Sequence, residues 1–291
     1  MQVIFHCGAH GTEEDRLLKT LLRNTERFRP HGTVAPGPGK YRYLLKDCMA
    51  ALQEGNATPE SRDILWDAIL EEEQADRVLL SNANFFGSQR QAIDGSQFYP
   101  EAETRLLALQ QLFGQDQIEL FIGLRNPATI LPVLLENANP QRKAQVLDKL
   151  DPYSLRWSDL LIRLREAVPQ VAISTWCFED MPLIWGQILR DMSGLDLNER
   201  LNGGMDMISA IMSREGMRRL RQYLAQHPDM SEIHRRRVFA AFLDKYAKED
   251  ELEEEIDLPG WSEDVVDTVT ELYEEDMDRV QRIPGVTLIA P

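Results

Sequence analysis

The sequence has few cysteines, no long apolar run and no excess of basic residues, and each absence excludes a class of protein. Its three cysteines, Cys7, Cys48 and Cys177, are widely spaced and form no CxxC pair. A disulfide framework or a zinc ribbon is therefore not expected, and we predict reduced, buried thiols. No apolar segment is long enough to cross a bilayer, and the first residues lack a basic and apolar leader pattern. We expect a soluble, cytoplasmic protein with no membrane partner.

The excess of acidic over basic residues is concentrated in one segment. The formal net charge is −16, and residues 244–282 hold sixteen acids against four bases, which leaves −4 for the rest of the chain. A field of this sign disfavours nucleic acid but permits a small anion held by local groups. Two arginine-rich helices are expected to present their charges to solvent and to compensate nearby acids: Arg214, Arg218, Arg219 and Arg221, then Arg235, Arg236 and Arg237.

Short apolar segments alternate with helical periodicity along most of the chain. Strands are expected at residues 2–7, 77–81, 117–124, 170–177 and 286–289. Helices are expected between them, at residues 13–24, 43–54, 59–74, 101–113, 127–137, 153–168 and 182–193. This alternation is typical of α/β proteins, and it predicts a three-layer α/β/α fold with a mainly parallel sheet.

The character of the sequence changes after residue 195. Helices are expected at residues 206–226, 231–246 and 262–283, so the C-terminal portion is mostly helical. We predict a single domain over residues 1–291, with a sheet-bearing core in 1–195, a helical portion in 196–283 and a final strand at 286–289. Pro and Gly recur through residues 29–39, which predicts an irregular surface loop near the end of the first strand.

The first strand runs into a glycine-containing turn, Gly-Ala-His-Gly-Thr at residues 8–12. A strand, such a turn and a helix together direct backbone N–H groups at an anion. Here Glu13, Glu14 and Asp15 follow at once. Thr12 has the pattern of an N-cap with Asp15 three residues on, and the acids would fill the first helical turn, where the helix dipole favours negative charge. We therefore expect a stable helix start that repels phosphate.

This turn resembles the phosphate loop of PAPS-dependent sulfotransferases, in particular bacterial members of that P-loop family. Their loop has a Gly-x-His-Lys-Thr-Gly-Thr-Thr-like sequence, which holds the 5′-phosphosulfate. Gly11 stands where the family has Lys, and residues 13–15 replace its Gly-Thr-Thr. The resemblance implies a P-loop NTPase or sulfotransferase-like sheet, PAPS as cofactor, and a cofactor-binding loop made of Gly8, Ala9, His10, Gly11 and Thr12.

A second element of the resemblance is Arg125-Asn126-Pro127, at the end of the strand expected at residues 117–124. It looks like the family's 3′-phosphate motif, because an Arg fork and a helix N-terminus both suit a phosphate. The resemblance therefore makes Arg125 and Asn126 cofactor-binding candidates. The Ser that the family carries eight residues after its Arg is Val133 here. A purely structural alternative is that Arg125 bridges the carboxyl ends of neighbouring strands.

A third element follows the strand at residues 77–81. Ala83 stands where many relatives carry a Glu that acts as general base, and it cannot remove a proton. Asn84 and His31 are the candidates for binding the acceptor, although Asn84 also has the pattern of a turn residue. His10 is the remaining candidate base, since an imidazole titrates near neutrality; the alternative is a loop residue hydrogen-bonded to backbone.

The sequence gives no metal site, because His6, Cys7 and His10 lie on a strand and turn, where their spacing does not put them on one helix face. We expect a divergent sulfotransferase-like protein that is impaired in PAPS binding. Three functions stay open: sulfuryl transfer to a small-molecule or glycan acceptor by rearranged groups, ligand binding without turnover, and protein interaction through the acidic helical end. The oligomeric state is not determined by the sequence.

Overall fold

The chain is built around one parallel β-sheet. The computed structural model describes all residues except 14, 54–60, 72, 197–198, 252–255 and 257. Within the described residues, six strands form the sheet in the order β2-β3-β1-β6-β7-β8, and every neighbouring pair is parallel. The strands are β1 (Gln2–His6), β2 (Thr33–Val34), β3 (Arg77–Ser81), β6 (Gln117–Leu124), β7 (Ala172–Cys177) and β8 (Val286–Ile289).

Both faces of the sheet are buried, which explains why its strands are apolar rather than alternating. Val3 and Phe5 of β1 point into one hydrophobic cluster, and Ile4 points into another on the opposite face. The first cluster is covered by α3 (Arg42–Gln53), α4 (Ser61–Leu70), α5 (Ala102–Phe113), α6 (Pro127–Leu135), α7 (Pro140–Lys149), α8 (Trp157–Ala167) and α13 (Glu263–Val280). The second is covered by α1 (Arg16–Leu22), α2 (Thr25–Phe28) and α9 (Met181–Ser193).

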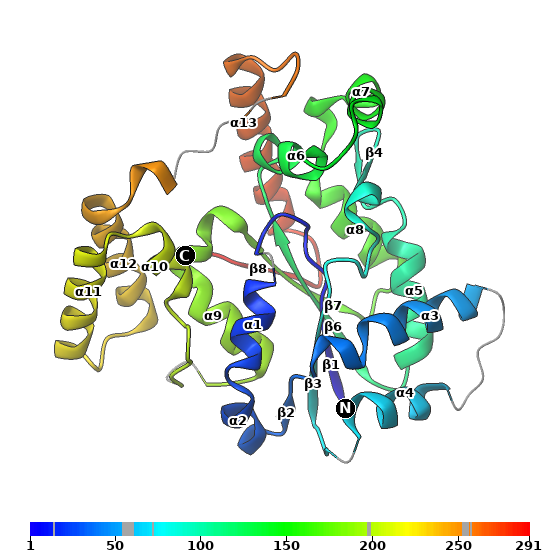
Figure 1. Ribbon diagram of the computed structural model, residues 1–291, viewed down its shortest axis with the longest axis horizontal. Helices are drawn as coiled ribbons and strands as arrows, with labels where there is room; N and C mark the ends of the chain where they lie inside the picture. The colour runs from blue at the N-terminus through cyan, green and yellow to red at the C-terminus, as the bar shows by residue number, and fades with distance from the viewer. Residues whose placement is uncertain (14, 54–60, 72, 197–198, 252–255, 257) are drawn as a thin grey trace.

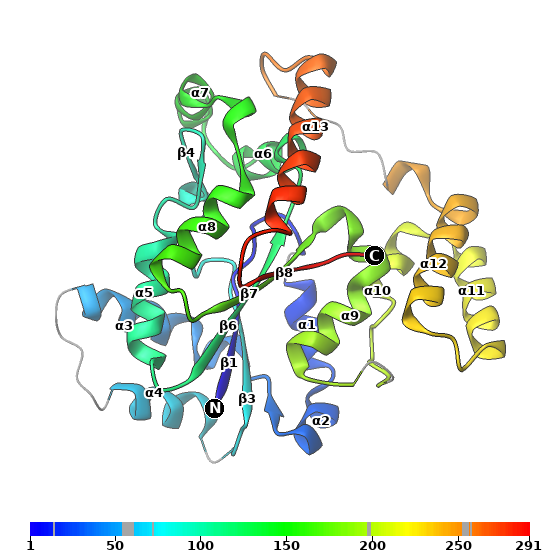
Figure 2. The same ribbon diagram turned by 180° about the vertical axis from the view of Figure 1, so that it is seen from behind.

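Three further helices extend this second layer away from the sheet. They are α10 (Asp206–Ile211), α11 (Arg214–Gln226) and α12 (Glu232–Tyr246), which pack around their own small core of Ile208, Met212, Met217, Leu220 and Phe239. They lie beyond α9, at the end of the molecule opposite α3 and α4 (Figure 1). The later helix α13 returns across the back of the sheet beside α8, as Figure 2 shows, and leads into β8.

The five strands expected from the sequence correspond to β1, β3, β6, β7 and β8, which confirms an α/β fold with a mainly parallel sheet. The helix expected at residues 206–226 is wrong in one respect, since it is two helices. Ser213 is the N-cap of the second helix, α11, because its hydroxyl accepts a hydrogen bond from the Gly216 amide at 3.2 Å. The ends of the expected helices at residues 54, 59–60 and 72 lie outside the described residues.

The segment at residues 29–39 was expected to be irregular throughout, and that expectation is wrong. It contains the 3₁₀ turns η1 (Arg29–His31) and η2 (Pro38–Lys40) on either side of β2. A proline starts or immediately follows the start of each turn, where its fixed φ suits the geometry. The helices α2 and α7 and the antiparallel pair β4 (Ile93–Asp94) and β5 (Gln97–Phe98) were also not expected.

Each cysteine is a free thiol, but only Cys7 is fully buried, whereas Cys48 and Cys177 are half-buried. The expectation of three buried thiols is therefore correct only for Cys7. Within the described ranges, every helix is too short or too polar to span a lipid bilayer.

Candidate functional site

The loop at residues 8–15 leaves β1 at the carboxyl edge of the sheet, the usual ligand-binding edge of open α/β folds. In the register of the sheet, His6 lies beside Ser81 of β3 and beside Phe121 of β6. Arg125 follows β6 and Asn84 follows β3 by a few residues. The sheet thus brings the predicted loop, Arg125 and Asn84 to one edge.

Two amides of the loop, those of Ala9 and His10, already have acceptors within the protein. The Ala9 amide donates to the Gly123 carbonyl at 3.0 Å, and the Gly8 carbonyl accepts from the Gly123 amide at 2.7 Å. The loop therefore continues the pairing of β1 with β6 past the end of the strand. The next amide, that of His10, donates to the Tyr99 hydroxyl at 2.9 Å. The amides of Ala9 and His10, predicted to donate to a phosphosulfate, therefore have acceptors within the protein, and Gly8 contributes its carbonyl to the same pairing.

Arg125 binds the loop instead of facing away from it. Its Nη1 donates to the Gly11 carbonyl, and its Nε donates to the Thr129 hydroxyl at 3.0 Å. The guanidinium also stacks over the Phe178 ring, with its Cζ 4.5 Å from the ring centroid. The side chain is only 7% exposed. Arg125 therefore holds the loop by binding the Gly11 carbonyl. This contact agrees with the structural alternative, in which Arg125 bridges segments at the carboxyl ends of neighbouring strands.

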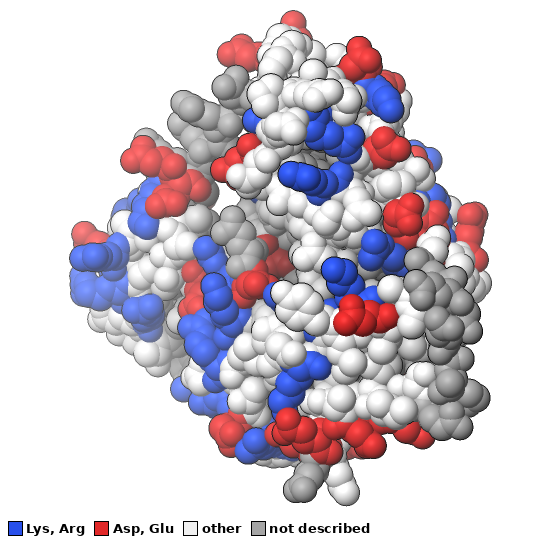
Figure 3. Space-filling model, turned by 45° about the vertical axis from the view of Figure 1, so that its right-hand side comes forward, with Lys and Arg blue, Asp and Glu red and all other residues white. Residues whose placement is uncertain are grey.

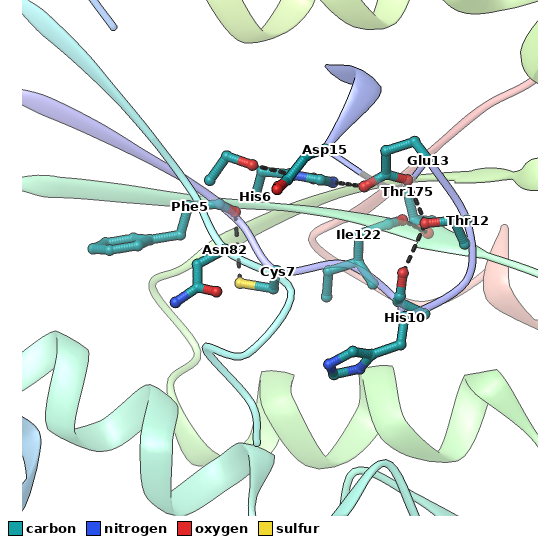
Figure 4. A network of polar contacts seen from close by, with 12 residues as sticks. Phe5, His6, Cys7, His10, Thr12, Glu13, Asp15, Asn82, Ile122 and Thr175 are labelled. Atoms are coloured by element: carbon teal, nitrogen blue, oxygen red, sulfur yellow. Dashed lines mark hydrogen bonds and ion pairs between the residues drawn. The ribbon is translucent and has the colours of Figure 1, made fainter. Parts of the chain in front are cut away.

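Glu13 is directed inward, toward His6. Its Oε1 lies 2.6 Å from Nε2 of His6, and both side chains are about 4% exposed. The other imidazole nitrogen, Nδ1, is 2.8 Å from the Ser81 hydroxyl. The Nε2 contact is short but not aligned as a hydrogen bond. Figure 4 shows the dashed contacts that join His6 to Glu13 and Glu13 to Thr12.

This Ser, His and Glu arrangement was not expected from the sequence. The order of contacts is that of a hydrolase triad, but Ser81 is only 3% exposed and its main chain is held by the Tyr41 hydroxyl on both its N–H and C=O. A nucleophile must reach its substrate, so the triad is a buried structural contact. The one signal in the sequence is that His6 and Ser81 each end an apolar strand.

The start of α1 differs from the prediction. The helix begins at Arg16, not at residue 13, and no acid lies in its first turn. Thr12 does not cap it, because Asp15 holds the cap position; the Thr12 hydroxyl instead donates to the Ala9 carbonyl at 2.7 Å. Asp15 occupies the cap position in a left-handed conformation with φ 61° and makes no side-chain cap. Glu14, which was expected in the same turn, lies outside the described residues.

Asp15 contacts another helix instead. Its Oδ1 accepts a hydrogen bond from Nη2 of Arg42 at 2.6 Å. This hydrogen bond lowers the pKa of the Asp15 carboxyl below its ordinary value. Glu13 and Asp15 are therefore paired with the protein's own His6 and Arg42 rather than with the N-terminus of α1.

His10, the candidate base, has partners on both ring nitrogens. Oδ1 of Asn84, which can only accept, lies 3.2 Å from Nε2, so this contact assigns the proton of the neutral imidazole to Nε2. Nδ1 is then the acceptor, and it accepts from the Tyr99 hydroxyl 2.9 Å away. Burial lowers the pKa of His10, while the Asn84 hydrogen bond and the charge of Glu13 act in the opposite direction. The neutral imidazole has no lone pair left for a substrate proton.

Asn126 and His31 do not match their predicted roles. Asn126 is the N-cap of α6, accepting from the Ala128 amide at 2.9 Å, and its Nδ2 donates to the Thr270 hydroxyl at 2.8 Å. It therefore docks α13 against α6. His31 precedes Gly32, whose carbonyl accepts from the amides at the start of β3. His31 thus lies at the amino edge of the sheet, at the opposite end of the strands from Asn84.

A cavity of about 670 Å³ opens beside Asn84, between α3, α5 and the segment after β3. Asn82 and Asn84 form one wall, and Phe85 and Met49 contribute apolar surface. Sequence reasoning found Asn84 but missed the basic side chains that α3 and α5 contribute, because no motif marks them.

No group of three or more His, Cys, Asp or Glu side chains in the described part of the chain is arranged to hold a metal ion. No protein-family model matches this sequence, and no curated protein matches it. The function of the chain is therefore inferred from the geometry of the site.

Proposed function

We propose that this chain is a divergent sulfotransferase-like protein of the P-loop type that binds a small ligand without transferring a sulfuryl group. The observation that carries the proposal is the contact from Arg125 to the Gly11 carbonyl. In an anion site the loop would present amides and the Arg would bind a phosphate. Here the guanidinium of Arg125 binds a carbonyl of the loop itself.

The neighbouring contacts support the same conclusion. Sulfuryl transfer depends on donors and cations placed where negative charge develops. The amides of Ala9 and His10 have protein acceptors, and the Glu13 carboxylate lies within the loop. These residues do not fit a 5′-phosphosulfate. The parallel sheet, its strand order and the loop after β1 support the fold resemblance alone, since fold does not carry function.

The ligand site in this proposal is the cavity beside Asn84. It opens near the carboxyl edge of the sheet, where open α/β proteins usually bind ligands. Its volume of about 670 Å³ lies in the range of small-molecule pockets.

Thermal unfolding with 3′-phosphoadenosine 5′-phosphate, the product of PAPS-dependent transfer, tests the proposal. A ligand that binds the folded state raises the melting temperature. We expect saturating product to change the melting temperatures of the wild-type protein and of Arg125→Ala by the same amount, each measured against its own baseline, because Arg125 binds the Gly11 carbonyl and does not hold the nucleotide.

A rise in the wild-type melting temperature that Arg125→Ala abolishes would overturn the proposal and restore a cofactor site. Arg29→Ala is the matched control, because Arg29 is an exposed arginine at the amino edge of the sheet. It should behave as the wild type in either case.

A further inference from the structure

The cavity beside Asn84 is basic, although the chain as a whole is strongly acidic. Its lining includes Arg42 and Lys46 from α3 and Arg105 from α5, and no Asp or Glu lies among its twelve lining residues. The formal charge of the whole chain is −16. Figure 3, in which the right-hand side of Figure 1 comes forward, shows Lys and Arg interspersed with Asp and Glu over the middle of this face, and a row of acidic side chains along its lower edge. The local field in the cavity is therefore opposite in sign to the field of the molecule.

The three cations are not equally compensated. Arg42 is paired with Asp15 at 2.6 Å and donates from Nε to the Ser81 carbonyl at 3.1 Å. Among the described residues, no carboxylate forms an ion pair with Lys46 or Arg105. The Nε of Arg105 is buried and has no hydrogen-bond partner in the described part of the chain. A buried guanidinium donor without an acceptor is costly, so an acceptor supplied by a ligand would stabilise it.

The remaining wall suits the body of an organic molecule. Met49 and Phe85 are buried apolar side chains, and Tyr43 is 77% exposed at the rim. Asn82, Asn84, Ser88 and Gln91 add donors and acceptors that can orient hydroxyl or amide groups. Two cations on separate helices, with polar and apolar surface between them, match a molecule with anionic groups at more than one position.

We infer that this cavity binds a small organic anion that carries at least two phosphate, sulfate or carboxylate groups, with Lys46 and Arg105 as its principal anion-binding residues. The inference rests on the proposed ligand-binding function and names its ligand class. It does not involve the loop after β1, whose cation Arg125 binds the Gly11 carbonyl.

Calorimetric titration of the full chain with fructose 1,6-bisphosphate tests the inference, with fructose as the uncharged counterpart. The bisphosphate should bind, fructose should not, and added salt should weaken the interaction because it screens the exposed ammonium of Lys46. Lys46→Ala should weaken binding about tenfold or more, as expected for a lost charge-assisted hydrogen bond. Arg105→Gln should have a similar effect.

Lys149→Ala is the matched control, because Lys149 is an exposed lysine in the last turn of α7 and does not line the cavity. It should bind the bisphosphate as the wild type does. Lys46 is also exposed, so its replacement leaves the fold intact, and unchanged thermal unfolding of both variants without ligand would verify this.

Each contrary result has a distinct meaning. Absence of binding at millimolar bisphosphate, or equal affinity in Lys46→Ala and Lys149→Ala, overturns the inference. Fructose binding as strongly as the bisphosphate overturns the anionic class and leaves a ligand-binding function in place. Product nucleotide held through Arg125 overturns the proposed function and does not bear on this cavity.

Discussion

The imidazole of His6 lies 2.6 Å from the carboxylate of Glu13, and about 4% of each side chain is exposed. The carboxylate that was expected to repel a ligand at the start of a helix is instead a buried neighbour of a strand residue. It fixes the loop after β1 in a closed arrangement, together with the contact between Arg125 and the Gly11 carbonyl.

Replacing Glu13 by Ala should lower the free energy of unfolding by about 2–3 kcal/mol, because Nε2 of His6 is then buried without its carboxylate. Asp15→Ala is the comparison, since 48% of the Asp15 side chain is exposed in its pair with Arg42. That change should cost less than about 1 kcal/mol. Urea unfolding measures both values, and equal losses would contradict the buried contact.

The histidine beside Tyr99 should make stability depend on pH. Burial lowers the pKa of His10 below its ordinary value of 6.5, so the unfolded chain binds the proton more readily than the folded one. Stability from this residue is fully present above pH 6.5 and is lost as pH falls through 6.5 toward the lower folded value. Denaturation curves between about pH 5 and pH 8 should show a steeper loss for wild type than for His10→Gln. Parallel profiles would contradict the assignment.

Gly11→Ala should destabilise the protein by about 1–3 kcal/mol. Gly11 has φ +75°, and an added Cβ would lie 2.6 Å from Cγ1 of Val133. Gly39→Ala is the control, because no atom lies within 4 Å of the added carbon, and its effect should stay within about 0.5 kcal/mol. In a Val133→Ala protein, Gly11→Ala should cost less, because the clash with Cγ1 of Val133 is removed and only the unfavourable positive φ remains. If Gly11→Ala costs as much there as in the wild type, the whole destabilisation comes from φ.

Asp276, an acid of the C-terminal acidic segment, has an internal role. Asp276 of α13 is 1% exposed and accepts hydrogen bonds from the amides of Trp157 and Ser158 at 2.7 and 3.1 Å, at the start of α8. Asp276→Ala should lower the free energy of unfolding by about 3 kcal/mol, since it leaves buried donors unpaired. Asp278→Ala, at an exposed position of the same helix, should change it by less than about 0.5 kcal/mol. Similar melting temperatures for the two variants would contradict the docking role.

The strands could be predicted from the sequence because a parallel strand buried on both faces must be a short apolar run. Gln117–Leu124 is such a run, and its observed bounds equal the expected ones. The two-residue strand β2 could not be predicted, since it is too short to show a pattern. It exists because it pairs with the start of β3, a contact between distant parts of the chain.

The site was less predictable for a related reason. The sequence placed Gly8, Arg125 and Asn84 near one edge of the sheet, because carboxyl ends of parallel strands meet there. It predicted a helix from residue 13 because local charge favoured one. Tertiary contacts override this local preference, because Glu13 contacts the buried His6 and Asp15 pairs with Arg42. The helix therefore begins at Arg16. Such pairings depend on partners that local pattern does not reveal.

Asn84 belongs to two environments at once, since its Oδ1 faces Nε2 of His10 and its side chain also lines the basic cavity. A ligand that hydrogen-bonds this amide polarises a group that already contacts the His10 imidazole. The imidazole is therefore an internal reporter of occupancy: its ring proton resonances should move when a ligand in the cavity contacts Asn84, without any added label.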